Sequence, residues 1–194
     1  MLHVIKKHKH VLFLLFLLAA GFAGWVHTHA CNPGSLSSGT MGVSTSVTNN
    51  CKIKSITNLA FGSYDPTLGT GATGSGTFTL LCTKGMPVTN IDIDKGQHPS
   101  TTSIKRQMQG PGSGTEVLQY DLYQPANFDY SGGTGGTCPG TVLWGGGVAG
   151  GAVLAAGSSP GGVGFSIPVC GKIPAGSNVS AGSYADQVTI TVNF

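Results

Sequence analysis

Apolar and polar residues alternate with a period of two along most of the chain after residue 40, and this pattern predicts β-strands. The alternation is most regular at the C-terminus, where one face carries Val188, Ile190, Val192 and Phe194. The apolar faces of four further stretches contain Phe78, Leu80 and Cys82; Thr89, Ile91 and Ile93; Leu118, Tyr120 and Leu122; and Val163, Phe165, Ile167 and Val169. No stretch has the 3.6-residue period of an amphipathic helix. Two sheets that pack through such faces form a sandwich, so the chain is predicted to be all-β.

Two segments depart from this simple pattern. Pro168 lies inside one of the predicted strands and cannot donate a ladder hydrogen bond, so that strand is expected at a sheet edge or at a bulge. Residues 131–162 contain thirteen glycines and predict a long surface excursion, interrupted by a short strand at residues 141–144. Neither segment predicts a second domain.

A separate alternating stretch, MGVSTSVTNNC, occupies residues 41–51 and ends at Cys51. One face of it carries Met41, Val43, Thr45 and Val47, and the other face carries only glycine, serine and threonine. It is predicted to be a strand. The pattern leaves open whether this strand pairs within its own domain or with a neighbouring molecule.

The first 30 residues have the layout of a secretory signal. Lys6, Lys7 and Lys9 form a basic start, residues 11–20 are apolar, and residues 28–30 read THA, with small residues at the cleavage-reading positions. The uncharged run at residues 11–26 is shorter than the roughly 20 residues of a membrane-spanning helix. The chain is therefore predicted to be exported and to begin at Cys31 after cleavage.

Removing the signal changes the apparent charge. The full chain has a formal net charge of +3, and the three signal lysines account for all of it. The remaining 164 residues carry equal numbers of basic and acidic side chains. A chain of this length is sufficient for one domain. Its net charge of zero does not favour nucleic acid or an anionic membrane as a partner.

Five cysteines remain in the exported chain, where an oxidising compartment favours disulfides. Two bridges and one leftover allow fifteen arrangements, and spacing does not choose among them. We favour Cys51 with Cys82, which would close a loop between two predicted strands, and Cys138 with Cys170, which would tie down the glycine-rich excursion. Cys31 would then be left over, and it could carry a lipid or enter another bridge.

No motif predicts catalysis, a cofactor, a metal site or a small-molecule substrate. His98 is the only histidine after the signal, and it lies in a polar turn, KGQHPS, that is typical of a solvated loop. Asp92 and Asp94 alternate with isoleucines, and the surrounding loop lacks the further oxygen ligands of a calcium site. The two aspartates are interpreted as residues on the solvent-exposed face of a strand.

From Cys51 to Phe194 the chain resembles the spore coat protein U domain family, which includes the subunits of archaic chaperone-usher pili. The matching stretches are FGSYDP at 61–66, CTKG at 82–85, LQYDLY at 118–123, LWG at 143–145 and the ending CGKIPAGSNVSAGSYADQVTITVNF at 170–194. They occur in this order across nearly the whole exported chain.

The resemblance implies an immunoglobulin-like β-sandwich that lacks one strand and is completed by donor-strand complementation. It divides the chain into a signal (1–30), an N-terminal extension (31–50) and a pilin domain (51–194). The expected donor residues are Met41, Val43, Thr45 and Val47. Expected candidates for the edge of the accepting groove are Val163, Phe165, Ile167 and Val169. The resemblance also supports the Cys51–Cys82 bridge.

The implied partners are a periplasmic chaperone, an outer-membrane usher, and identical or related subunits. The implied location is the cell surface, reached through the periplasm, as a pilus or coat that serves adhesion or biofilm formation. The alternative is a self-contained secreted binding module, in which residues 41–47 pair internally and Tyr123, Tyr130 and Trp144 line a carbohydrate or surface-ligand site. A secreted hydrolase is the least favoured interpretation.

Overall fold

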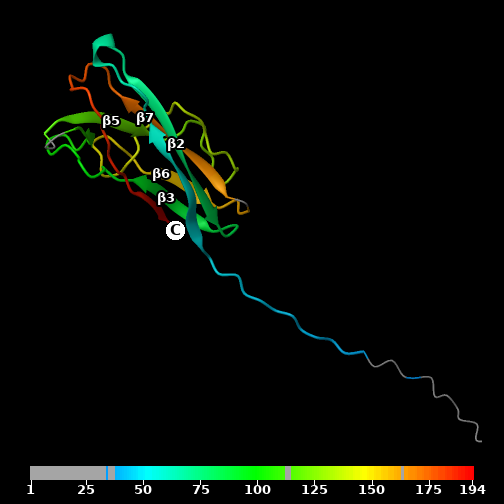
Figure 1. Cartoon of the computed structure of the whole chain (residues 1–194). Coiled ribbons are helices and arrows are strands. Elements are labelled where there is room, and N and C mark those ends of the chain that lie inside the picture. Colours follow the sequence, from blue (N-terminus) through cyan, green and yellow to red (C-terminus); the bar gives the residue numbers. More distant parts are fainter. Residues whose placement is uncertain (1–33, 35–37, 112–114, 163) are drawn as a thin grey trace, which may run out of the picture. The chain divides into compact units, whose positions relative to one another are not determined.

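Two antiparallel β-sheets form the body of the protein in a computed structural model, which describes residues 34, 38–111, 115–162 and 164–194 (Figure 1). The predicted signal, Cys31 and Val163 lie outside the described residues. The strands are β1 (Cys51–Ala60), β2 (Ala72–Cys82), β3 (Pro87–Ile93), β4 (Arg106–Gln109), β5 (Val117–Tyr123), β6 (Leu154–Ser158), β7 (Phe165–Ile173) and β8 (Ile190–Asn193). A single turn of 3-10 helix, η1, spans Pro66–Leu68.

The larger sheet has the strand order β1-β2-β7-β5-β4, and the smaller sheet has the order β6-β3-β8. Their inner faces meet in one core, which contains Phe78 and Ile167 from the larger sheet and Ile91 and Ile93 from the smaller. This arrangement confirms the predicted all-β, immunoglobulin-like sandwich. Within the described residues, no helix is long and apolar enough to cross a membrane.

Most predicted inward faces are buried, and the exceptions lie at the C-terminus, where Phe194 is exposed, and on β3. Thr89 is exposed, whereas Val88, on the opposite face of the strand, is buried. On the same face as Val88, the Asp92 carboxylate accepts a hydrogen bond from the backbone N–H of Gly146 at 2.9 Å. Val88 is 1% exposed and belongs to the buried core cluster, which the alternation of a half-exposed strand does not predict.

The expectation that the strand containing Pro168 lies at a sheet edge is wrong. β7 lies between β2 and β5, in the middle of the larger sheet. Its pairing with β5 covers only Cys170–Lys172, so Pro168 lies beyond the end of that ladder while it still pairs with Thr77 of β2. Proline is tolerated there because β7 has a ladder partner on one side only at that point.

The glycine-rich excursion is anchored to the core. Trp144 is fully buried, packs against Phe78 at a ring-centroid distance of 6.1 Å and donates its indole N–H to the Ile91 carbonyl at 3.0 Å. A disulfide joins Cys138 of the excursion to Cys170 of β7. The predicted short strand at residues 141–144 is reduced to two isolated bridges.

Candidate strand-binding groove

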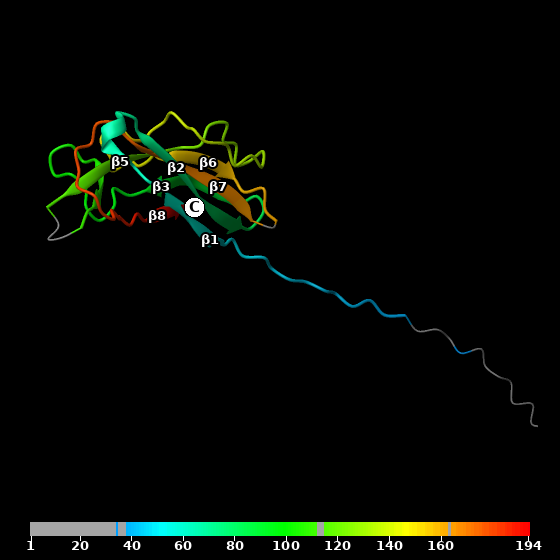
Figure 2. The same ribbon diagram turned by 45° about the horizontal axis from the view of Figure 1, so that its top comes forward.

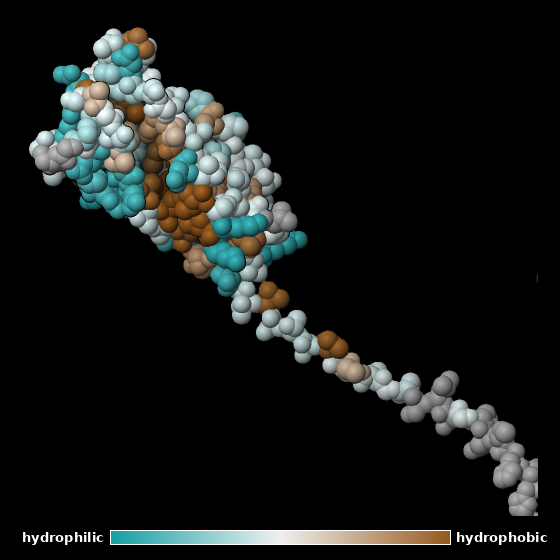
Figure 3. Space-filling model, in the orientation of Figure 1, coloured by the Kyte–Doolittle hydropathy of each residue, from teal (hydrophilic) through white to brown (hydrophobic). Residues whose placement is uncertain are grey.

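Each sheet ends in an unpaired strand edge, and the two edges lie on the same side of the sandwich. In the described part of the chain, β1 pairs with β2 only and β8 pairs with β3 only. Figure 2 shows both strands side by side on this flank. Between β1 and residues 184–190 lies a groove with a volume of about 760 Å³. Figure 3 shows a strip of apolar side chains along it.

The floor of this groove is the core itself. Residues that line it from the interior are Ile93, Met108, Tyr120, Leu122 and Val169. Some apolar residues that line it remain partly in water: Ile56 is 59% exposed, and Val188 and Ile190 are only half-buried. Farther along the C-terminal strand, Val192 is half-buried and Phe194 is 63% exposed. A layer of apolar side chains is therefore missing between the two sheet edges, at the position of one strand.

β1 closes one end of the groove by bending across the inner face of the larger sheet. Its pairing with β2 shifts register twice, and the second shift lies between Thr57 and Ala60. Leu59 packs onto glycines of β2 and β7: a Cβ at Gly76 would lie 2.8 Å from the Thr57 carbonyl oxygen, and one at Gly171 would lie 2.8 Å from the Leu59 side chain. The glycines make this close crossing feasible, and the groove runs along β1 from Ile53 to Leu59.

The opposite wall is a stretch of C-terminal chain that crosses between the sheets. Ala185 pairs with Gln109 at the edge of the larger sheet, and β8 begins at Ile190 in the smaller sheet. Between these points the backbone groups of residues 186–188 have no backbone partner among the described residues. This part of the wall is an unpaired edge next to the groove.

Asp186 holds that wall in place. Its carboxylate is only 2% exposed, and it accepts hydrogen bonds from the Tyr120 hydroxyl (2.6 Å) and from the Gln97 backbone N–H (3.0 Å). The Nδ1 atom of His98 lies 3.4 Å from the same carboxylate. Burial, followed by the hydrogen bond to Asp186, raises the pKa of Tyr120, so its hydroxyl stays protonated and donates. His98 therefore contacts a structural carboxylate, with its side chain 37% exposed.

Asp94 and Arg106 stabilise the next residues of the same wall. The Asp94 carboxylate accepts from the backbone N–H groups of Thr189 (2.9 Å) and Gly96 (3.0 Å). The fully buried Arg106 donates to the carbonyls of Ile93 (2.6 Å) and Asp94 (2.7 Å). Burial raises the pKa of the Asp94 carboxyl, but the hydrogen bonds and the positive charge of Arg106 outweigh it, so the pKa is lowered.

This lowered pKa predicts a loss of stability in acid. A carboxyl group with a lowered pKa in the folded state stabilises the fold above its unfolded-state pKa, near 3.8, and that contribution is lost as the pH falls through the folded-state pKa. We expect Asp94→Asn to be less stable than the unmodified chain at pH 7. Urea unfolding at a series of pH values should show this difference shrinking between about pH 5 and pH 2. A difference that stayed constant over this range would contradict the assignment.

The structure places three of the four expected groove-edge candidates, Phe165, Ile167 and Val169, on β7, inside the sheet, and Val163 lies outside the described residues. Ile167 is fully buried, and Phe165 packs against Tyr130 with ring centroids 4.9 Å apart. Of these three, only Val169 lines the groove, as part of its floor. The edges that border the groove belong to β1 and to the segment leading into β8. The two-residue period does not predict β1, because the bulge in this strand separates Ile53 from Ile56 by three residues.

The expected donor residues are exposed in their own chain. Met41 is 87% exposed, Val43 90% and Val47 79%, and residues 38–50 form no strand. The last residues before β1 are held by Thr83, whose hydroxyl donates to the Thr48 carbonyl at 3.1 Å. The apolar face of residues 41–47 is thus not part of the core.

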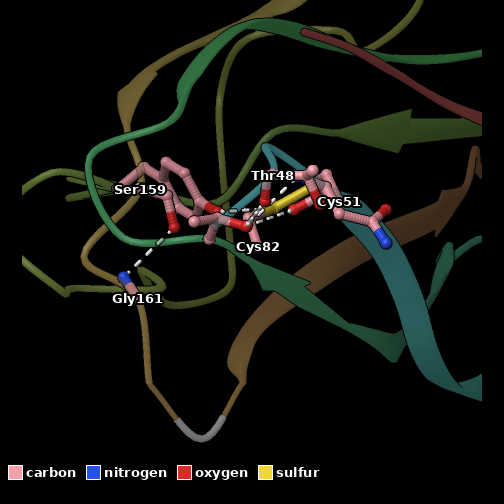
Figure 4. The surroundings of a disulfide bond; sticks show 8 residues. Thr48, Cys51, Cys82, Ser159 and Gly161 are labelled. Carbon is pink, nitrogen blue, oxygen red and sulfur yellow. Dashed lines mark hydrogen bonds between the residues drawn. A yellow bond between two sulfur atoms is a disulfide. The ribbon is translucent and has the colours of Figure 1, made fainter. Parts of the chain in front are cut away.

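Two disulfides join the cysteines of the described chain: Cys51 with Cys82, and Cys138 with Cys170. Figure 4 shows the first, which ties the start of β1 to the end of β2 beside Thr48. The Tyr130 hydroxyl lies 3.3 Å from the Cys82 sulfur. No group of three or more histidine, cysteine, aspartate or glutamate side chains in the described residues could hold a metal ion.

Comparisons with known proteins give a match to a family model, to a curated relative and to a solved structure. The family model of the Spore Coat Protein U domain matches residues 37–191. Protein U of Myxococcus xanthus is 27% identical over 146 residues, which cover 70% of this chain and 71% of Protein U. A chain in the crystal structure of the CsuC–CsuE chaperone–tip adhesion subunit pre-assembly complex, from the archaic chaperone-usher Csu pili of Acinetobacter baumannii, is 16% identical with a TM-score of 0.44. That match covers 76% of this chain but only 40% of the other.

Proposed function

Because the chain belongs to the Spore Coat Protein U domain family, we propose that it is an exported structural subunit of a chaperone-usher pilus or surface coat, polymerising by donor-strand exchange. The observation that carries this proposal is the apolar groove of about 760 Å³ between the unpaired edges of β1 and residues 184–190. A strand inserted there would cover the exposed apolar rim and pair with both edges.

The occupant of the groove changes along the assembly route. In the periplasm a chaperone fills it, and at an outer-membrane usher the N-terminal extension of the next subunit replaces the chaperone. That subunit is identical or related to this one. The assembled chain acts at the cell surface in adhesion, biofilm formation or a coat, and it catalyses no reaction.

The exposed alternating segment at residues 41–47 supports this function over a self-contained binding module. In the module, these residues would pair within their own domain, whereas their apolar side chains are 79–90% exposed. The module would also need aromatic side chains at the surface, and both Trp144 and Tyr130 are buried.

The proposal can be tested with a variant that ends the growth of the polymer. A variant that lacks residues 31–47 keeps Thr48 and Asn50, which bond to Thr83, and keeps the whole groove, so it can accept a strand but cannot donate one. The chain beginning at residue 31 is expected to form a ladder of polymers during purification without a chaperone, and the truncated chain is expected to stay monomeric. Adding truncated chain to the full chain should shorten the polymers in proportion to its share. Polymerisation of the truncated chain by itself would contradict the donor role.

A further inference from the structure

The chain that leads from β7 to the groove, residues 174–184, forms a strap that belongs to neither sheet. Both of its ends are fixed by backbone pairing: Ile173 pairs with Ala72 of β2, and Ala185 exchanges two hydrogen bonds with Gln109, at 2.8 and 3.0 Å. Between these points, no backbone group of the strap bonds to another backbone group of the described chain. Segments with so little backbone pairing are the ones that open locally while the rest of a protein stays folded.

Two side chains from other parts of the domain hold the strap in place. The Tyr64 hydroxyl donates to the Pro174 carbonyl at 3.4 Å and accepts from the Ser177 N–H at 3.1 Å. The Glu116 carboxylate accepts from the Ser180 N–H. Tyr64 lies before η1 and Glu116 lies before β5, so the strap is fixed at two points by two separate segments.

A cavity of about 770 Å³ separates the strap from residues 59–66. Of the strap's side chains, Val179 and Tyr184 pack against the core, and the alanines at 175 and 181 are exposed. The strap therefore contributes little apolar burial, and it can lift without breaking either flanking ladder. Lifting it would expose the buried side chains at the base of the cavity, which are Met108, Leu118 and Ile173.

The cavity and the groove meet at one end of the groove. The residues that line both are Leu59, Phe61, Met108 and Tyr184. Tyr184 is part of the strap, and its hydroxyl donates to the Ser180 carbonyl at 2.9 Å, so its ring is tied to the residue that Glu116 holds. The position of the strap therefore decides whether this end of the groove is closed.

We propose that the strap opens as one unit and controls the access of a strand to this end of the groove, with Tyr64 and Glu116 as the positioning residues that keep it closed. This inference rests on the proposed strand exchange and adds a regulation of the same groove. When the strap lifts, Tyr184 leaves the end of the groove, and the cavity and the groove become one continuous apolar hollow. When it returns, the hydrogen bonds of Tyr64 and Glu116 form again.

Both tests of this proposal use the domain as a monomer. The chains begin at residue 31 and carry Cys31→Ser together with Val43→Asp and Val47→Asp. Val43 and Val47 are exposed, so aspartate at these positions leaves the strap unchanged. The strap variants are Tyr64→Phe and Glu116→Met, and each removes the group that holds the strap while it keeps the bulk of the side chain.

Amide hydrogen exchange, followed by NMR, tests whether the strap opens as one unit. Tyr64→Phe is expected to raise the exchange rate of the Ser180 amide, which Tyr64 does not contact, about fivefold. Glu116→Met is expected to raise that of the Ser177 amide by at least as much. The matched control is Tyr123→Phe, which removes a hydroxyl from β5 and should leave both amides unchanged.

Two results would overturn the common opening. In the first, each substitution changes only the amide that lost its own partner, so the two ends of the strap move separately. In the second, Tyr123→Phe raises the exchange of both strap amides as much as the strap variants do, so these amides exchange only when the whole domain unfolds.

A fluorescent peptide of residues 38–50 tests the control of access, with its binding followed by stopped-flow anisotropy. Because entry scales with the open fraction of the strap, both strap variants should bind the peptide faster by the same factor that exchange shows, and Tyr123→Phe should bind it at an unchanged rate. Equal rates in all chains would overturn the control of access and leave the proposed function in place. Failure of the peptide to bind any chain would instead remove the proposed function and the control of access with it.

Discussion

Replacing Val43 and Val47 together with aspartate is expected to abolish self-assembly of the chain and to leave the stability of its own domain unchanged. Both side chains are largely exposed in their own chain, so a charge there remains in water. In the groove of a neighbour the same charges would lie over an apolar floor, at a penalty of several kcal/mol for each ion. Assembly should therefore weaken by at least about a thousandfold.

Size-exclusion chromatography with light scattering measures the assembly, and urea unfolding measures the domain. The matched control is Ser44→Asp with Ser46→Asp, which adds the same charge on the opposite face of the segment. The control is expected to assemble nearly as well as the unmodified chain. Equal loss in both variants would show that net charge, and not the inward face, decides assembly.

The largest expected loss of folding stability comes from Trp144→Ala, at roughly 3–5 kcal/mol. The indole is fully buried, packs on Phe78 and donates to the Ile91 carbonyl, which would be left without that partner. Urea unfolding should show the change as a lower midpoint. Val142→Ala, two residues away and 49% exposed, is the control and should change stability little. A small effect of Trp144→Ala would mean that the excursion is not anchored through this side chain.

Regular alternation of apolar and polar residues correctly predicted the strands in which every second side chain faces the core. β2 and β5 bury the predicted side chains, β7 buries Ile167 and Val169, and β8 turns the predicted face inward. It failed for β1, whose bulges break the period, and for Val88, which is buried on the face of β3 that the pattern predicts to be exposed. In both cases the cause is tertiary packing, which a period of two does not contain.

The groove shows even more clearly that a local sequence pattern does not predict tertiary contacts. The donor segment is contiguous, so its face can be read from residues 41–47 alone. The groove is assembled from β1, the floor strands and residues 184–190. Its lining residues lie up to 137 positions apart, from Ile53 to Ile190, and no local pattern marks them as neighbours. The edge position predicted from Pro168 was wrong for a related reason, because a proline in a central strand is tolerated where the neighbouring strand has already ended.

The Cys51–Cys82 bridge has a mechanical consequence in a fibre of the proposed kind. Tension between subunits would reach each domain through the chain at residue 50 and act first on the start of β1. The disulfide passes this load covalently to the end of β2, which is paired on both sides in the larger sheet. The hydrogen bonds between β1 and β2 would then not be pulled open one at a time from their exposed end, and the wall of the groove that grips the neighbouring subunit would keep its shape under load.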